Sequence, residues 1–278
     1  SVIWDVQRVG PSTGMPTRTM QADILSCVYA SHGDTLHICL FPANPTECYE
    51  FAQTAFDLAE QLQQLVFVLS DLDIGMNYWL CDELQYPNKP FNRGKLLTNK
   101  DVIDWSKYER YGDPDGDGIS HRVLPGMPKM EAAFLTRGSG HNMKAGYTEK
   151  STEYMALIQK LKRKWITAKN LVPQPLIESN GEKIGVIAFG SSDSMINELK
   201  SLTAFGFDYL RIRALPLTDS IKDFINKHEK VFVVEQNVDG QMIKILQTEW
   251  PELASRLHFI ANYDGMPISA EKIAEVMI

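Results

Sequence analysis

Short apolar runs alternate with helical stripes along much of the chain. Residues 2–6 form an almost continuous apolar run, and residues 36–41 and 65–69 form two more, as strands buried in a parallel sheet do. Between the last two runs, Asn44-Pro45-Thr46 opens a segment whose apolar residues recur every three or four positions up to residue 62. That spacing predicts an amphipathic helix, and the alternation predicts a parallel, doubly wound sheet.

Two other segments of the N-terminal half carry weaker patterns. Residues 18–29 can form a helix after a loop at residues 10–16. Residues 72–146 are rich in Gly, Pro and Asn and show no periodicity. A structureless loop of that length is uncommon in a compact domain, so we expect short strands there that pack against the sheet or a partner.

The C-terminal half predicts a second α/β unit. A helix is predicted from Ser151 to Ala168, and Pro173 and Pro175 mark a linker after it. Apolar runs at residues 184–189, 209–212, 231–235 and 257–260 then alternate with helical segments. The chain of 278 residues is long enough for two domains, and the predicted fold class is α/β with two doubly wound parallel sheets.

The predicted helix at residues 151–168 has two different sides. Tyr154, Ile158, Leu161 and Trp165 share an apolar face with Ala168, whereas most of the basic residues lie on the other side: Lys160, Lys162, Arg163 and Lys164. The basic side suggests either anion binding or a solvated helix surface. We favour the solvated surface.

Composition excludes several classes of function. The net charge of −7 gives no general attraction to nucleic acid or to an anionic membrane surface. No apolar run approaches the roughly 20 residues that span a bilayer, and residues 1–6 lack the features of a signal peptide. We therefore expect a cytoplasmic protein with neither a nucleic-acid nor a membrane partner.

The cysteines do not predict a metal site. Cys27, Cys39, Cys48 and Cys81 stand singly, without the Cys-x-x-Cys pairs typical of zinc or iron–sulfur sites. Free thiols are the expected state, and any iron–sulfur cluster of the reaction would be held by another chain.

The clearest candidate site is the loop at residues 7–19, which follows the first predicted strand. Ligands of parallel α/β sheets bind beyond the carboxyl ends of the strands, where this loop is expected to lie. Its glycines allow close backbone approach, its hydroxyls can donate hydrogen bonds, and Arg8 can hold a carboxylate with two parallel bonds. A rigid turn that caps the next helix remains the alternative interpretation. The loop has neither a Walker A nor a G-x-G-x-x-G pattern.

The order of residues in this loop resembles a known family. Gln7-Arg8, Gly10-Pro11-Ser12-Thr13-Gly14 and Pro16-Thr17-Arg18-Thr19 are similar to the signature of 2-oxoacid:ferredoxin oxidoreductase α subunits. Further matches follow in the order of the family: residues 115–119, 124–126, 138–141, 234–237 and 240–241. The resemblance thus extends over nearly the whole chain.

The resemblance implies a reaction and roles for three residues. In this family a 2-oxoacid is oxidatively decarboxylated to acyl-CoA and the electrons pass to ferredoxin, with 2-oxoglutarate the favoured substrate here. Arg8 would bind the substrate carboxylate, and Thr17 would form a hydrogen bond with the substrate near its reacting carbon. Arg18 is a lesser candidate. Residues 1–145 would be the later part of a pyrimidine-type thiamine domain, and residues 146–278 a transketolase-C-terminal-like domain with a leading helix.

The resemblance also implies that the chain is incomplete as a catalyst. Thiamine diphosphate, magnesium and a [4Fe-4S] cluster would be held mainly by a β subunit, and none by this chain alone. The family's Tyr-Pro-Ile-Thr-Pro segment and its thiamine-activating glutamate normally precede the signature, so we expect the natural polypeptide to continue upstream. A non-catalytic α/β binding or assembly module derived from the same fold is the rival hypothesis.

Four other sequence features are interpreted as structural rather than as ligand-binding or catalytic. Asp113-Pro114-Asp115-Gly116-Asp117-Gly118 resembles the start of a calcium loop, but Leu124 stands where such a loop needs a glutamate, so a turn is favoured. His141 is expected to be structural or to lie at an interface. Residues 188–193 are expected to form a packing turn, and Glu235 to stabilise the end of a strand.

Overall fold

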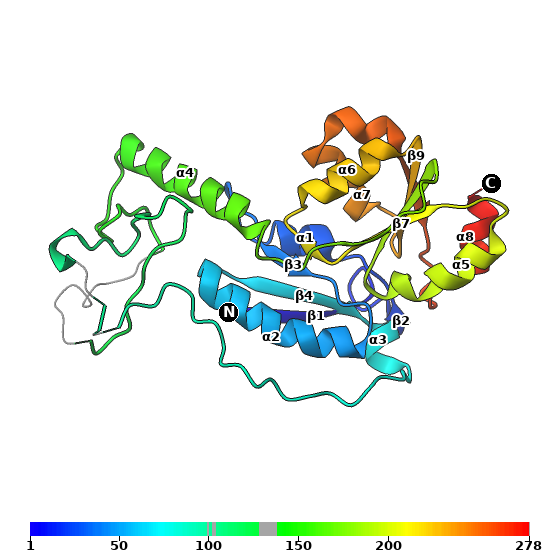
Figure 1. The fold of residues 1–278 in the computed structure, drawn as a ribbon, viewed down its shortest axis with the longest axis horizontal. Helices are drawn as coiled ribbons and strands as arrows, with labels where there is room; N and C mark the ends of the chain where they lie inside the picture. The colour runs from blue at the N-terminus through cyan, green and yellow to red at the C-terminus, as the bar shows by residue number, and fades with distance from the viewer. Residues whose placement is uncertain (99, 102–103, 128–137, 278) are drawn as a thin grey trace.

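The computed structural model describes all residues except 99, 102–103, 128–137 and 278. The chain forms two five-stranded sheets that are mainly parallel (Figure 1). The first has the strand order β2 (Met15–Thr19), β1 (Val2–Val9), β4 (Val66–Asp71), β3 (Ile38–Leu40), β8 (Ala214–Leu215). The second has the order β10 (Leu257–Ala261), β9 (Lys230–Glu235), β6 (Ile184–Phe189), β7 (Asp208–Ile212), β5 (Leu176–Glu178). The predicted α/β class with two parallel-dominated sheets is confirmed.

Three edge strands depart from the all-parallel prediction. The strand β2 pairs antiparallel with β1, β8 with β3, and β5 with β7. The strand β8 comes from the second half of the chain but completes the first sheet. One apolar core joins the two sheets, and the rings of Phe41 and Phe189 lie 5.4 Å apart within it.

The helices pack around these sheets. They are α1 (Ile24–Val28), α2 (Pro45–Leu62), α3 (Leu72–Met76), α4 (Ser151–Ala168), α5 (Ile196–Leu202), α6 (Asp219–Lys227), α7 (Gln241–Glu249) and α8 (Ala270–Val276). Short 3₁₀ helices occupy Trp105–Lys107, Gly190–Met195 and Pro251–Arg256. The α2 prediction is confirmed: Asn44 accepts a hydrogen bond from the Glu47 amide as N-cap, and Phe51, Ala55, Leu58 and Leu62 face the core.

The predicted helix at residues 18–29 is wrong over its first half. Residues 15–19 form β2, and only Ile24–Val28 are helical. Pro16 and the β-branched Thr17 and Thr19 favour an extended chain, and pairing with β1 satisfies its backbone. The local apolar pattern contains no information about that pairing.

The strand β1 is less buried than its apolar run predicts. Ile3, Trp4 and Val6 are 44%, 40% and 44% exposed. Residues 2–7 pair with β4 on one side, whereas β2 reaches only Arg8 and Val9 on the other. Within the described residues, most of one edge of β1 is therefore unpaired.

The segment after α3 and the helix α4 also correct the sequence predictions. Between residues 77 and 150 the described residues form isolated bridges at Leu96–Arg122 and His141–Tyr147 rather than the expected short strands. From α3 the segment first runs along α2, and its later part lies with α4 at one end of the molecule (Figure 1). The basic side of α4 is not simply solvated, because Lys160 is only 6% exposed while Tyr154, assigned to the apolar face, is 54% exposed.

Candidate functional site

The strands β1 and β2 form a hairpin that carries all three predicted site residues. Its turn spans residues 10–14, and a register irregularity falls between Arg8 and Val9. A Cβ added to Gly14, which has a φ of +46°, would lie 2.2 Å from the carbonyl oxygen of Val9. Only glycine fits this close return of the chain. The turn and its entry are therefore fixed by the signature that the sequence analysis singled out.

The pairing places Arg8 and Thr17 on one side of the hairpin. Arg8 pairs with Thr19, and alternation along β2 puts Thr17 on the same face as Thr19. Arg18 projects from the other face. All three predicted residues are exposed.

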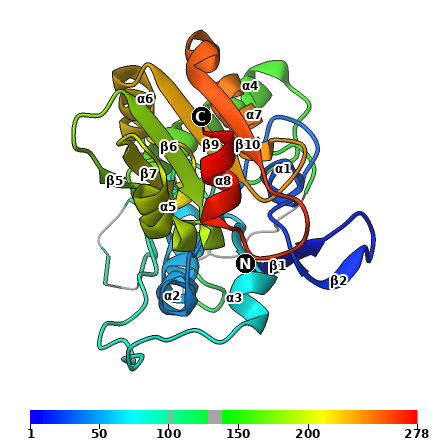
Figure 2. The same cartoon turned by 90° about the vertical axis from the view of Figure 1, so that its right-hand side faces the viewer.

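The charged groups of the hairpin have few protein partners. Within the described residues, the Arg8 guanidinium forms neither an ion pair nor a hydrogen bond, while Arg18 donates to the carbonyl of its neighbour Thr17 at 3.3 Å. An exposed guanidinium without a carboxylate partner is available to bind an anion from solution. The hairpin extends from one side of the molecule (Figure 2).

A buried polar network anchors the base of the hairpin. The Gln7 side chain donates to the Ser70 carbonyl at 3.3 Å and accepts from the Asp23 amide at 3.1 Å. The Gln21 side chain donates to the Phe189 carbonyl of the second sheet at 3.0 Å, and the Gln21 amide donates to the Gln236 carbonyl at 2.8 Å. The chain on both sides of the hairpin is thus held by buried hydrogen bonds.

The strand ends of both sheets meet in this network. The Ser191 hydroxyl donates to Asp71 at 2.6 Å, and the Gln236 side chain donates to Ser191 and Ser192. Burial raises the pKa of Asp71 above its usual value. The hydroxyls of residues 191 and 192 are used in contacts between the sheets, which supports the predicted packing turn.

Glu235 stabilises the end of its strand, as predicted. Its carboxylate accepts hydrogen bonds from the amides of Met242 and Ile243, both at 2.8 Å, at the start of α7. It also accepts from Asn237, whose side chain donates to the Gln21 carbonyl below the hairpin. Burial raises the pKa of Glu235 despite these bonds.

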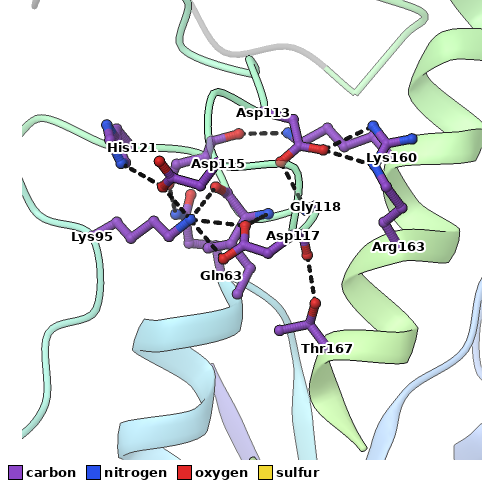
Figure 3. A network of polar contacts seen from close by, with 12 residues as sticks. Gln63, Lys95, Asp113, Asp115, Asp117, Gly118, His121, Lys160, Arg163 and Thr167 are labelled. Carbon is purple, nitrogen blue, oxygen red and sulfur yellow. Dashed lines mark hydrogen bonds and ion pairs between the residues drawn. The ribbon is translucent and has the colours of Figure 1, made fainter.

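The calcium-like loop is built from ion pairs. The Lys95 ammonium lies 2.6 Å from Asp115 and 2.7 Å from Asp117 (Figure 3). Asp113 pairs with Arg163 of α4 at 2.8 Å and accepts from the Gly118 amide at the same distance. Side chains of the protein therefore engage the carboxylates of this loop. The described residues contain no group of three or more His, Cys, Asp and Glu side chains that could hold a metal ion.

Sequence reasoning did not identify the anchoring role of three glutamines. Gln7, Gln21 and Gln236 are polar side chains that carry no catalytic pattern, and their partners lie up to about two hundred residues away along the chain. Polar residues at the ends of predicted strands were the available signal. His141, expected to be structural, packs its ring 4.0 Å from that of Tyr111.

Residues 1–85 match the family described as "Pyruvate flavodoxin/ferredoxin oxidoreductase, thiamine diP-bdg". The chain is 32% identical over 251 residues to subunit alpha of 2-oxoacid:ferredoxin oxidoreductase 2 from Aeropyrum pernix, a match covering 86% of this chain and 38% of that one. It is 29% identical over 263 residues to 2-oxoglutarate synthase subunit KorA from Methanothermobacter marburgensis, covering 88% of this chain and 64% of that one. The chain thus spans less than two thirds of either relative.

A solved structure has the same fold. The 2-oxoglutarate:ferredoxin oxidoreductase from Magnetococcus marinus, solved with 2-oxoglutarate, coenzyme A and succinyl-CoA bound, superposes with a TM-score of 0.85 at 23% identity. The match covers 99% of this chain and 48% of that one. No helix among the described residues is long and apolar enough to cross a bilayer.

Proposed function

Because residues 1–85 belong to the pyruvate flavodoxin/ferredoxin oxidoreductase family and the chain is related to 2-oxoacid:ferredoxin oxidoreductase α subunits, we propose that it supplies the 2-oxoacid carboxylate site of such an enzyme. The enzyme would decarboxylate a 2-oxoacid oxidatively, form an acyl-CoA and pass electrons to ferredoxin in the cytoplasm. The names of the KorA relatives and of the structural neighbour favour 2-oxoglutarate over pyruvate.

The Arg8 guanidinium is the observation that carries this proposal. It is exposed, has no partner within the described residues, and projects from a hairpin with a buried, hydrogen-bonded base. Arg8 would hold the substrate carboxylate with two parallel hydrogen bonds. Thr17, on the same face, would form a hydrogen bond with the substrate near its keto carbon. Arg18, on the opposite face, would add positive charge near the loop.

The cofactors would be shared with other chains. The family that matches residues 1–85 is described as thiamine-diphosphate-binding, which supports this cofactor for the enzyme. From the family resemblance we assign the diphosphate, the magnesium and the [4Fe-4S] cluster mainly to a β subunit, with ferredoxin as electron acceptor. The contribution of this chain is to bind and orient the substrate.

The two halves of the chain have different proposed origins. Residues 1–145 would form the later part of a pyrimidine-type thiamine domain, and residues 146–278 a transketolase-C-terminal-like domain. The family match at residues 1–85 supports the first assignment. A non-catalytic module remains the rival for the whole chain, and the activity experiment separates the two.

The test is 2-oxoglutarate-dependent and coenzyme A-dependent reduction of an electron acceptor by the assembled complex. Arg8→Ala and Thr17→Ala should lower turnover without preventing assembly, with Lys227→Ala as a control that removes an exposed cation elsewhere. Undiminished turnover in both site variants would disprove the site assignment. An assembled wild-type complex that is inactive with every common 2-oxoacid would favour the module.

A further inference from the structure

A cavity of about 210 Å³ lies between the C-terminal end of α2, residues 110–120 and α4. Four of its lining residues carry basic side chains: Arg110, His141, Lys160 and Lys164. None of the described lining residues is acidic. The cavity therefore concentrates positive charge in a confined volume, although the protein as a whole is acidic.

The nearby carboxylates are used elsewhere. Asp113 pairs with Arg163 at 2.8 Å, and Asp117 pairs with Lys95 at 2.7 Å. Figure 3 shows Lys160 and Arg163 reaching from α4 toward the loop that carries Asp113. Both carboxylates thus pair with cations that lie outside the described cavity lining.

Two cavity residues retain hydrogen-bonding capacity. Lys160 donates to the Tyr111 carbonyl at 2.7 Å and to the Ser120 hydroxyl, which uses two of the three ammonium protons. The Nδ1 atom of His141 contacts the Ser139 carbonyl at 3.2 Å, whereas its buried Nε2 atom has no partner. The Nε2 atom is therefore available for a hydrogen bond with a group inside the cavity.

Lys160 is buried and Lys164 is partly buried, and both environments disfavour the charged form of the side chain. Burial, followed by repulsion from Lys164, lowers the pKa of Lys160 to about 8, and burial lowers the pKa of Lys164 to about 8. A bound anion would offset both effects. The volume is below the roughly 300–1,000 Å³ of pockets for drug-sized molecules, so only a small ligand fits.

We propose that this cavity binds a small oxyanion, either inorganic phosphate or the carboxylate of a small metabolite, between Lys160, Lys164 and His141. Both sources share charged oxygens that accept N–H donors. The site is built from α4 and the loop at residues 110–120, so it is separate from the β1–β2 hairpin. This inference does not depend on the proposed enzymatic function.

The test is calorimetric titration of the purified protein near pH 7 with sodium phosphate and, separately, with 2-oxoglutarate, at ionic strength held constant with sodium chloride. Saturable binding at one site per chain is expected for at least one of the two anions. Phosphate alone would identify a phosphate-type ligand, and 2-oxoglutarate alone a carboxylate. Because Arg8 is the proposed carboxylate ligand of the hairpin, both titrations use the Arg8→Ala protein, so that binding at the hairpin does not contribute.

Three variants locate the site. Lys160→Met, Lys164→Gln and His141→Gln should each weaken binding about tenfold or more, because a charge-assisted hydrogen bond contributes roughly 1.5–3 kcal/mol. The control Lys162→Gln, on the exposed side of the same helix, should change affinity less than about twofold. Circular dichroism would verify folding, and Lys164→Gln tests the site even if Lys160→Met unfolds. Heats no larger than those of sodium chloride, or binding unaffected in folded variants, would overturn the proposal.

Discussion

The β1–β2 hairpin and the α4 end of the molecule differ in how their arginine and lysine side chains are paired. On the β1–β2 hairpin, the Arg8 guanidinium is exposed and unpaired within the described residues. At the α4 end, the side chains of Lys95 and Arg163 pair with the carboxylates of Asp115 and Asp113. The first arrangement leaves a charge ready for a ligand, whereas the second fixes loops that lack regular structure. The environment of a cation, more than its type, therefore distinguishes a candidate site from a scaffold.

The largest expected effect concerns the buried support of the hairpin. Glu235→Ala should lower the free energy of unfolding by about 3 kcal/mol, because it leaves the amides of Met242 and Ile243 without an acceptor. Urea denaturation measures the change. The exposed Glu229→Ala serves as control and should stay within about 0.5 kcal/mol of wild type. A Glu235→Ala protein as stable as that control would contradict the anchoring role.

Arg8→Ala should separate function from stability. We expect kcat/KM for the 2-oxoacid to fall about 10- to 100-fold, the loss of one charge-assisted hydrogen-bonded contact, in steady-state assays of the assembled complex. The unfolding free energy should change by less than about 0.5 kcal/mol, because the side chain is exposed and has no partner in the described structure. A large loss of stability would show that Arg8 has a structural role, as Lys95 and Arg163 have at the α4 end.

Lys160 should give the α4 end a distinctive pH dependence. Its pKa is lowered from 10.5 to about 8, so between these values the unfolded chain binds more protons than the folded one. Stability should therefore rise as pH increases from about 8 to 10.5. The facing charges are Lys164, Asp113, Arg110 and Arg163, and Lys164 titrates in the same range.

Lys160→Met tests that dependence. The variant should reduce the rise without abolishing it, because Lys164 contributes too, and thermal unfolding across this pH range measures the difference. Lys162→Met is the matched control on the same helix. An unchanged slope in Lys160→Met would mean that its ammonium is not disfavoured by folding.

The smallest effect is expected at the acidic loop. Lys95→Met should cost at most about 1 kcal/mol, since its partners Asp115 and Asp117 are partly exposed and such pairs contribute little. The difference from wild type should shrink in high salt. Lys107→Met, which removes a more exposed pair, is the control. A loss of unfolding free energy several times larger would mean that this loop stabilises the fold as strongly as the buried contacts of Glu235.

The elements that were predicted correctly from the sequence are those with a clear local periodicity of apolar residues. The strand at residues 184–189 and the helices that begin at Pro45 and Ser151 agree with the structure. The strand β2 was missed because it depends on pairing with β1. Lys160 was expected on a solvated side because its partners, Tyr111 and Ser120, lie in a segment without periodicity.

The candidate site was only partly accessible to the same reasoning. The motif located Arg8 and Thr17 through a family resemblance, and the family assignment is confirmed. Their roles stay predictions. The supporting contacts of Gln21 with Phe189 and Gln236 join residues remote in sequence, so only the folded chain brings them together.

The open edge of β1 has a practical consequence for handling the protein. Within the part of the chain that the structure describes, backbone groups beside the exposed Ile3, Trp4 and Val6 lack strand partners and form a template onto which another strand can add. The purified chain should therefore self-associate and lose solubility as its concentration rises. A lysine introduced by Ile3→Lys should suppress that association in analytical ultracentrifugation, since a charge on an edge strand disfavours intermolecular pairing.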